Sequence, residues 1–154
     1  MRLPYQTLII LYKLVDGEPL FCVFHRATPD IWQFVSGGGE EGEQPAETAR
    51  RELWEETGIK ADHLLPLTSQ AFVPAAFIGP YHRQGWPVPT YVIPEHAFAF
   101  EADADTQPVL SEEHTEYAWL PFTEAKAVLR FDSNRVAMYE LLCRIKGETM
   151  HWDV

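Results

Sequence analysis

Residues 37–59 of the chain read GGGEEGEQPAETARRELWEETGI. Pro45 precedes a run without further proline or glycine, and Gly58 follows that run directly. A proline at the first turn and a glycine just past the end are typical of a helix. We therefore predict a helix over residues 45–57, with a glycine-rich segment before it.

The predicted helix gathers carboxylates on one side. At about 100° per residue, Glu52, Glu55 and Glu56 lie within an arc of roughly 100°, while Leu53 lies on an adjoining arc that can pack into a core. Like charges at this spacing repel by roughly a few tenths of a kcal/mol per pair. Carboxylate oxygens suit Mg²⁺ or Mn²⁺, which would remove this repulsion. These three residues alone leave a solvated acidic face open as the alternative.

The whole segment resembles the Nudix box. The matching positions are Gly37, Glu43, Arg51, Glu52, Leu53, Glu55, Glu56, Gly58 and Ile59. A chance match at all fixed positions has a probability on the order of one in a billion per starting position. The resemblance implies a pyrophosphohydrolase that hydrolyses a phosphoanhydride bond with Mg²⁺, or with Mn²⁺ in its place.

The Nudix resemblance also implies which residues carry the chemistry. Glu52, Glu55 and Glu56 would be catalytic and would bind metal, with the backbone carbonyl of Ser36 as a further ligand. In this family the general base is a glutamate of the helix or of a later loop. The later candidate is Glu113, which would be both catalytic and a metal ligand.

Four box residues would be structural by the same resemblance. Arg51 would pair with Glu43 to hold the loop against the helix, because a guanidinium fork suits a carboxylate. Gly37 would serve a tight loop, and Gly58 would form the C-cap of the helix. The chain has Ser36 before Gly37, where the family often has a glycine.

A looser resemblance extends from about residue 6 to residue 145. Segments 26–33, 113–120 and 133–135 look like the dihydroneopterin triphosphate pyrophosphohydrolase branch, often labelled dATP pyrophosphohydrolase. This branch implies a nucleoside triphosphate or pterin triphosphate as substrate and pyrophosphate as product. The residues that would approach the triphosphate or the base are His25, Arg26, Ser36 and His114. Each of them can also be an ordinary surface or strand residue.

Aromatic side chains could stack on a pterin or purine. Tyr81 and Trp86 lie in residues 79–89, a segment rich in proline and glycine that suits either a ligand-binding loop or a plain surface loop. Trp32 suits packing better than stacking.

Two further readings of the function stay open at this point. One is a hydrolase of another nucleoside diphosphate derivative, such as a dinucleoside polyphosphate or a sugar nucleotide. The other is a non-catalytic Nudix module that senses a ligand. Loss of box carboxylates would favour the module, and none is missing.

Outside the predicted helix the sequence mainly favours strands. Residues 6–15, 20–26, 31–35, 64–78, 90–99 and 116–120 read as extended. We expect the glycines at 37–39 to end the third strand. Pro121 opens helical territory, and Asp132 or Ser133 can cap a last helix. Because helices fall between and after strands, we predict an α+β fold, an α/β/α sandwich around a mixed sheet as in Nudix proteins.

Length and charge limit the remaining choices. The chain has 154 residues, which suits a single domain over residues 1–154. The net charge is -11 with 12 Lys and Arg, which disfavours a nucleic acid polymer or a membrane as partner. We expect a small phosphate-bearing ligand reached through cations, and a homodimer is compatible with the sequence. The first apolar run is short and the two cysteines match no zinc spacing, so we expect a cytoplasmic protein.

Overall fold

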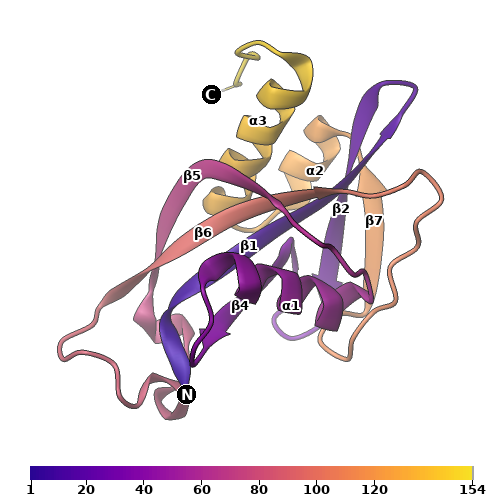
Figure 1. Cartoon of the computed structure of the whole chain (residues 1–154). Helices are drawn as coiled ribbons and strands as arrows, with labels where there is room; N and C mark the ends of the chain where they lie inside the picture. Colours follow the sequence, from indigo (N-terminus) through magenta and orange to yellow (C-terminus); the bar gives the residue numbers. More distant parts are fainter. Residues whose placement is uncertain (154) are drawn as a thin grey trace.

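A computed structural model describes residues 1–153 and contains a mixed seven-stranded sheet with helices on both faces (Figure 1). The strands are β1 (Arg2–Val15), β2 (Glu18–Arg26), β3 (Ile31–Gln33), β4 (Val35–Glu40), β5 (Leu65–Pro74), β6 (Val92–Glu101) and β7 (Glu116–Leu120). The α-helices are α1 (Pro45–Thr57), α2 (Phe122–Val128) and α3 (Asp132–Lys146). The predicted α+β class, with a mixed sheet between helices, is confirmed.

The long strand β1 organises both hydrophobic layers. It pairs antiparallel with β2 and β4 and parallel with β6. Because side chains alternate along a strand, Leu8 and Ile10 pack in the cluster formed with α2 and α3, whereas Ile9 and Leu11 pack with Leu53 of α1. Burial on both faces explains why this part of β1 is a continuous apolar run.

The sheet forks at one edge of β1. Strand β6 pairs along the opposite edge of β1. At the forked edge, β4 pairs with residues 2–9 of β1 and β2 pairs with residues 12–15. Strand β7 extends the β2 branch. The cavity that holds the site is lined by residues next to this fork.

The expectation that Gly37, Gly38 and Gly39 end a strand is wrong. The strand predicted over residues 31–35 is divided at Phe34 into β3 and β4, and the three glycines lie inside β4. Gly37 pairs with Thr7 and Gly38 with Gln6. Glycine is depleted in strands, which is why composition favoured a loop here.

The ends of α1 agree with the sequence and the start of α3 does not. The N–H of Gln44 donates to the Glu47 carboxylate at 3.0 Å, and Gly58 has a φ of 71° and caps the C-terminal end. The N-cap of α3 is Phe131, without a side-chain cap bond, so the prediction of Asp132 or Ser133 as the cap is wrong. Asp132 lies in the first turn, where the helix dipole favours a negative charge.

The region between β5 and β6 is more ordered than predicted. The extended segment ends at Pro74, and two short 3₁₀ turns follow at Ala75–Phe77 and Pro80–Arg83. Trp86 is buried, and its Nε1 donates to the carbonyl of Arg2 at 2.6 Å. Its neighbours form a small apolar cluster: Val73, Ala75, Ile78 and Ile93. No helix within residues 1–153 is long and apolar enough to cross a bilayer.

Glu140 of α3 closes a break in the pairing of β5 with β6. The register shifts within residues 66–70, and the N–H groups of Thr68 and Ser69 donate to the Glu140 carboxylate at 2.7 and 2.6 Å. Burial opposes ionisation of Glu140, but these donors and Arg144 outweigh it and lower its pKa to about 2. The ionised carboxylate therefore ties the helix to the strand.

We expect Glu140→Gln to lower the free energy of unfolding by about 2 kcal/mol at neutral pH, because hydrogen bonds to a charged group are lost. The folded pKa lies below the unfolded value of about 4.3, so this stabilisation is fully present above pH 4.3 and is lost as the pH falls through about 2. Urea unfolding at about pH 7 and about pH 2.5 measures the difference. The exposed Glu148→Gln is the control, and equal stability of the two variants at neutral pH would contradict the assignment.

Candidate active site

A cavity of about 1170 Å³ opens between β4, α1 and the start of α3. Three groups of residues line its polar part: Ser36, Gly37 and Gly38 from β4, Glu52 and Glu55 from α1, and Arg26 and Glu113 from the β2 branch and the loop before β7. The carboxylate helix and the later acidic loop therefore face one space.

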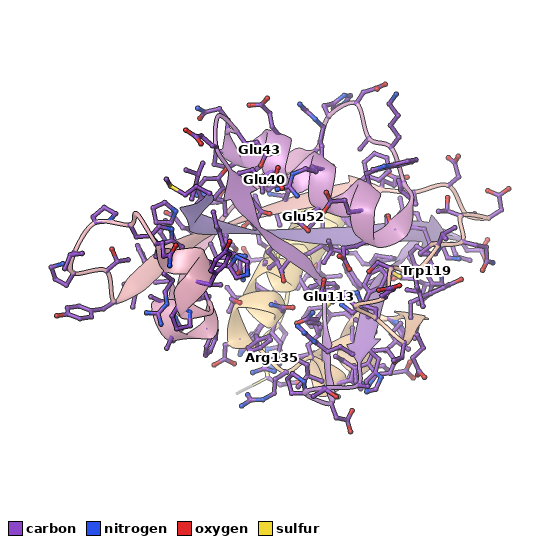
Figure 2. The ribbon with its side chains drawn as sticks, turned by 90° about the horizontal axis from the view of Figure 1, so that it is seen from below. Glu40, Glu43, Glu52, Glu113, Trp119 and Arg135 are labelled. Carbon is purple, nitrogen blue, oxygen red and sulfur yellow. The ribbon has the colours of Figure 1, made fainter. Side chains whose placement is uncertain are left out.

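Arg51 ties α1 to the segment before it. Its Nε donates to Glu43 at 2.7 Å and its Nη2 to the other oxygen of Glu43 at 3.0 Å, a bidentate pair. The same Nη2 donates to the carbonyl of Gly38 at 2.9 Å. The Arg51 hydrogen bond lowers the pKa of Glu43 to about 2. Figure 2 shows Glu43 and Glu52 near each other, beside α1.

Glu52 lies directly over β4, and Gly37 makes the space for it. A Cβ atom at Gly37 would be 2.0 Å from Cδ of Glu52. The role predicted for Gly37, a tight loop, is therefore corrected: the glycine allows close approach of a side chain to a strand. Burial raises the pKa of Glu52 to about 7; Arg51 opposes this rise, and the charge of Glu55 adds to it.

Glu56 is buried and contacts a second group of polar side chains, which includes the buried His114. Its Oε2 lies 2.9 Å from Nδ1 of His114 and accepts from Ser111 Oγ at 2.9 Å. Burial opposes its ionisation, but hydrogen bonds from His114, Glu113 and Ser111 outweigh burial and lower the pKa of Glu56. Burial, together with the contact to Glu56, raises the pKa of Glu113. The pKa values of the two carboxyl groups are therefore shifted in opposite directions, that of Glu56 downward and that of Glu113 upward.

The donor chemistry of this group fits a hard divalent cation. Carboxylate oxygens are what Mg²⁺ and Mn²⁺ bind. Burial first, and neighbouring carboxylates second, raise the pKa values of Glu52 and Glu113, and a cation would favour their ionised forms. In the present rotamers no three acidic, His or Cys side chains among residues 1–153 converge on one point. Arg51 holds Glu52 and His114 holds Glu56, so joint coordination needs both carboxylates to turn from these partners.

The sequence of the chain matches a known protein family. The model of the NUDIX domain family matches residues 6–142. The chain belongs to the Nudix family. This confirms the resemblance read from the box.

Nudix relatives cover nearly the whole chain. The dihydroneopterin triphosphate diphosphatase of Haemophilus influenzae is 27% identical over 142 residues, which is 92% of this chain and 89% of that protein. A Listeria monocytogenes protein described as a Nudix hydrolase has a TM-score of 0.83 and 37% identity, covering 98% of this chain and 100% of that one. The dihydroneopterin triphosphate pyrophosphohydrolase of E. coli has a TM-score of 0.75 and 26% identity, covering 93% and 97%. These comparisons also bear out the looser resemblance to that branch.

A second kind of relative shares less of its length. The RNA pyrophosphohydrolase of Caulobacter vibrioides is 37% identical over 110 residues, 68% of this chain, and the match spans 63% of that protein. Both kinds of relative are named as diphosphatases or pyrophosphohydrolases, which hydrolyse phosphoanhydride bonds. This Nudix protein is therefore a pyrophosphohydrolase.

Of the four residues expected to approach the substrate, the structure places two at the cavity and two elsewhere. Arg26 and Ser36 line the cavity of the Nudix site, and Nη1 of Arg26 lies 3.5 Å from Glu113. His25 and His114 are not among the lining residues. His25 follows the alternation of β2, so it faces away from Arg26 and bonds to Asp30 and Thr115.

His114 is buried between two partners. Its Nε2 lies 3.1 Å from Nε2 of Gln33, and its other ring nitrogen faces Glu56. Expecting His114 at the substrate conflicts with this burial. The structure makes it a positioning residue for Glu56.

None of the three aromatic residues considered from the sequence lines the cavity. Trp32 is half-buried beside His25, with ring centroids 5.0 Å apart, and Tyr81 is 76% exposed. Trp86 is buried, so it offers no free face for stacking, which corrects that expectation. The aromatic wall is instead Phe77 and Phe131, whose centroids are 6.2 Å apart.

Sequence reasoning missed three polar residues of β1 and β6 that line the cavity. Arg2, Gln6 and Glu95 line it, and none belongs to the box. One signal could have found Glu95: it is a charged residue in an apolar strand, at the alternation of the buried Ala97 and Ala99.

Proposed function

We propose that the chain hydrolyses a nucleoside triphosphate or a pterin triphosphate to the monophosphate and pyrophosphate, with Mg²⁺ as cofactor and Mn²⁺ as its substitute. The observation that carries this proposal is that Glu52, Glu113 and Arg26 line one cavity. Its volume of about 1170 Å³ accommodates a nucleotide, since ligand pockets measure roughly 300–1,000 Å³. Two relatives named for dihydroneopterin triphosphate support the substrate class.

The metal would be held by Glu52, Glu55, Glu56 and Glu113, with the carbonyl of Ser36. When bound, a divalent ion neutralises phosphate charge and lowers the pKa of water. A chain of net charge -11 needs such mediation to bind a polyphosphate.

The protein's own groups would bind the phosphates and move the proton. Arg26 offers a guanidinium to phosphate oxygens at the cavity surface. Glu113 is the general base in this proposal, because its raised pKa makes it a better proton acceptor than an ordinary carboxylate once it is ionised. Glu56 would keep Glu113 in place through their hydrogen bond, and Arg51 would keep Glu52 over β4.

A dinucleoside polyphosphate or a sugar nucleotide is the second candidate. The cavity volume slightly exceeds the usual upper range, which leaves room for a larger ligand. The net charge of -11 still disfavours a nucleic acid polymer, whose binding depends on clustered Lys and Arg.

A substrate panel tests the proposal. We expect dihydroneopterin triphosphate and deoxynucleoside triphosphates to yield pyrophosphate with Mg²⁺ or Mn²⁺ and nothing with EDTA. Their kcat/KM should exceed that of diadenosine tetraphosphate and ADP-ribose by about tenfold or more, since each such factor corresponds to about 1.4 kcal/mol of transition-state binding. Release of orthophosphate alone, activity in EDTA, or a preference for the dinucleotide would reject the proposal.

A further inference from the structure

Three polar side chains, from β1 and β6, form a chain of hydrogen bonds in the cavity. Nη2 of Arg2 donates to Oε1 of Gln6 at 3.2 Å, and Nε2 of Gln6 donates to Oε2 of Glu95 at 2.7 Å. Gln6 and Glu95 are direct neighbours across β1 and β6. All three residues line the cavity.

Glu95 is buried but incompletely satisfied. The residue is 4% exposed, and its Oε1 has no hydrogen-bond partner within residues 1–153. Leaving a buried acceptor unpaired costs free energy, so such a group in a cavity points to a ligand donor. Arg2 fixes the Gln6 amide so that its NH₂ group faces Glu95, which orients the carboxylate and leaves Oε1 free.

This end of the cavity suits a flat ring. Apolar side chains line the same cavity as Glu95: Leu8, Val73, Phe77, Ile78 and Phe131. Gln6 pairs with Gly38 of β4 on one side and with Glu95 of β6 on the other, so Glu95 lies two strand spacings from β4, about 10 Å. A triphosphate beside β4 and α1 would therefore place its heterocycle near Glu95.

We propose that Glu95 and Gln6 select a heterocycle with two adjacent N–H donors, the edge of the 2-amino-4-oxopyrimidine ring that guanine and pterins share. The ring N–H and the exocyclic amine of this edge can both donate to one carboxylate. Adenine presents an amine next to an unprotonated ring nitrogen, and this nitrogen would oppose the carboxylate oxygen. A buried polar group left unpaired by the wrong ligand gives strong discrimination. The inference rests on the proposed triphosphate substrate and names its base.

Kinetics on dGTP and dATP test the selection. We expect kcat/KM for dGTP to exceed that for dATP by about 10²-fold, within the range for sites that hydrogen-bond their substrate. Glu95→Gln should remove most of this ratio through KM for dGTP, with little change in kcat. Glu101→Gln, in the same strand but exposed, is the matched control and should keep the ratio. An unchanged ratio in Glu95→Gln would overturn the inference.

Binding without metal separates this inference from the proposed function. Calorimetry should show dGMP binding at least tenfold tighter than dAMP to the wild type, and this difference should vanish in Glu95→Gln. If the wild type cleaves no triphosphate, the proposed function fails, and the dGMP preference still supports the base site. If both monophosphates bind equally, the base site fails while triphosphate cleavage stands. The thermal unfolding temperature of Glu95→Gln should match or exceed that of the wild type, because the variant keeps an acceptor for Gln6 and loses an unpaired buried carboxylate oxygen.

Discussion

Replacing Glu56 by glutamine is expected to lower kcat by about 10³-fold while the fold survives, which corresponds to several kcal/mol of lost transition-state stabilisation. The buried Glu56 stays ionised, because hydrogen bonds from His114, Glu113 and Ser111 outweigh the effect of burial on its pKa. The variant removes that negative charge where the metal would bind. It also places an amide NH₂ against the neighbouring His114 or Glu113.

Turnover of dGTP at saturating Mg²⁺, together with Mg²⁺ titration, measures this effect. Glu124→Gln on the exposed surface of α2 is the control and should keep wild-type kcat. The Glu56→Gln protein should also need more Mg²⁺ for half-maximal activity. A variant that kept full Mg²⁺-dependent turnover would remove Glu56 from the proposed machinery.

Gly37→Ala is expected to lower kcat/KM by about 10²-fold or more without changing any charge. The new Cβ would be 2.0 Å from Cδ of Glu52, whereas ordinary contacts begin at 3.4 Å, so the carboxylate must move by more than about 1 Å. Gly37 lies in β4, pairs with Thr7 of β1 and has no positive φ. Alanine therefore suits the backbone at this position, and the fold should remain. A displaced Glu52 would be the cause of the loss.

The matched control for Gly37→Ala is Gly79→Ala. There a Cβ would meet nothing nearer than His82 at 3.9 Å, and the φ is negative. Steady-state kinetics of both variants, with their melting temperatures, separate displacement of Glu52 from unfolding. Wild-type kinetics in Gly37→Ala, with an unchanged melting temperature, would contradict the placement of Glu52 over β4.

Local signals in the sequence predicted the helix and its neighbours well. The boundaries of α1, the glycine C-cap at Gly58 and the three-layer fold depend on periodicity and capping chemistry that short stretches contain. The ion pair between Arg51 and Glu43 followed from the resemblance to the Nudix box, whose residues lie in one contiguous segment. These features needed no knowledge of distant strands.

The remaining features depend on long-range pairing, which spacing does not encode. The glycines of β4 appeared to end a strand because their pairing with Thr7 and Gln6 is 30 or more positions away. The direction of Glu56 toward His114, and the contact of Gln6 with Glu95 across 89 positions, arise only when strands and loops assemble. Polarity at Gln6 and Glu95 was visible in the sequence, but their proximity was not.

The two ends of the cavity have different origins along the chain. Most of the hydrolytic end comes from one contiguous segment, Gly37 to Gly58, whereas the proposed base end combines β1, β6 and the walls around them. Mutations at Gln6 or Glu95 can therefore change which molecule is accepted without altering the glutamates of α1. Descendants of such a protein can acquire new metabolic roles by exchanging a few side chains, and an intact box then identifies a reaction but not a nutrient, signal or toxin.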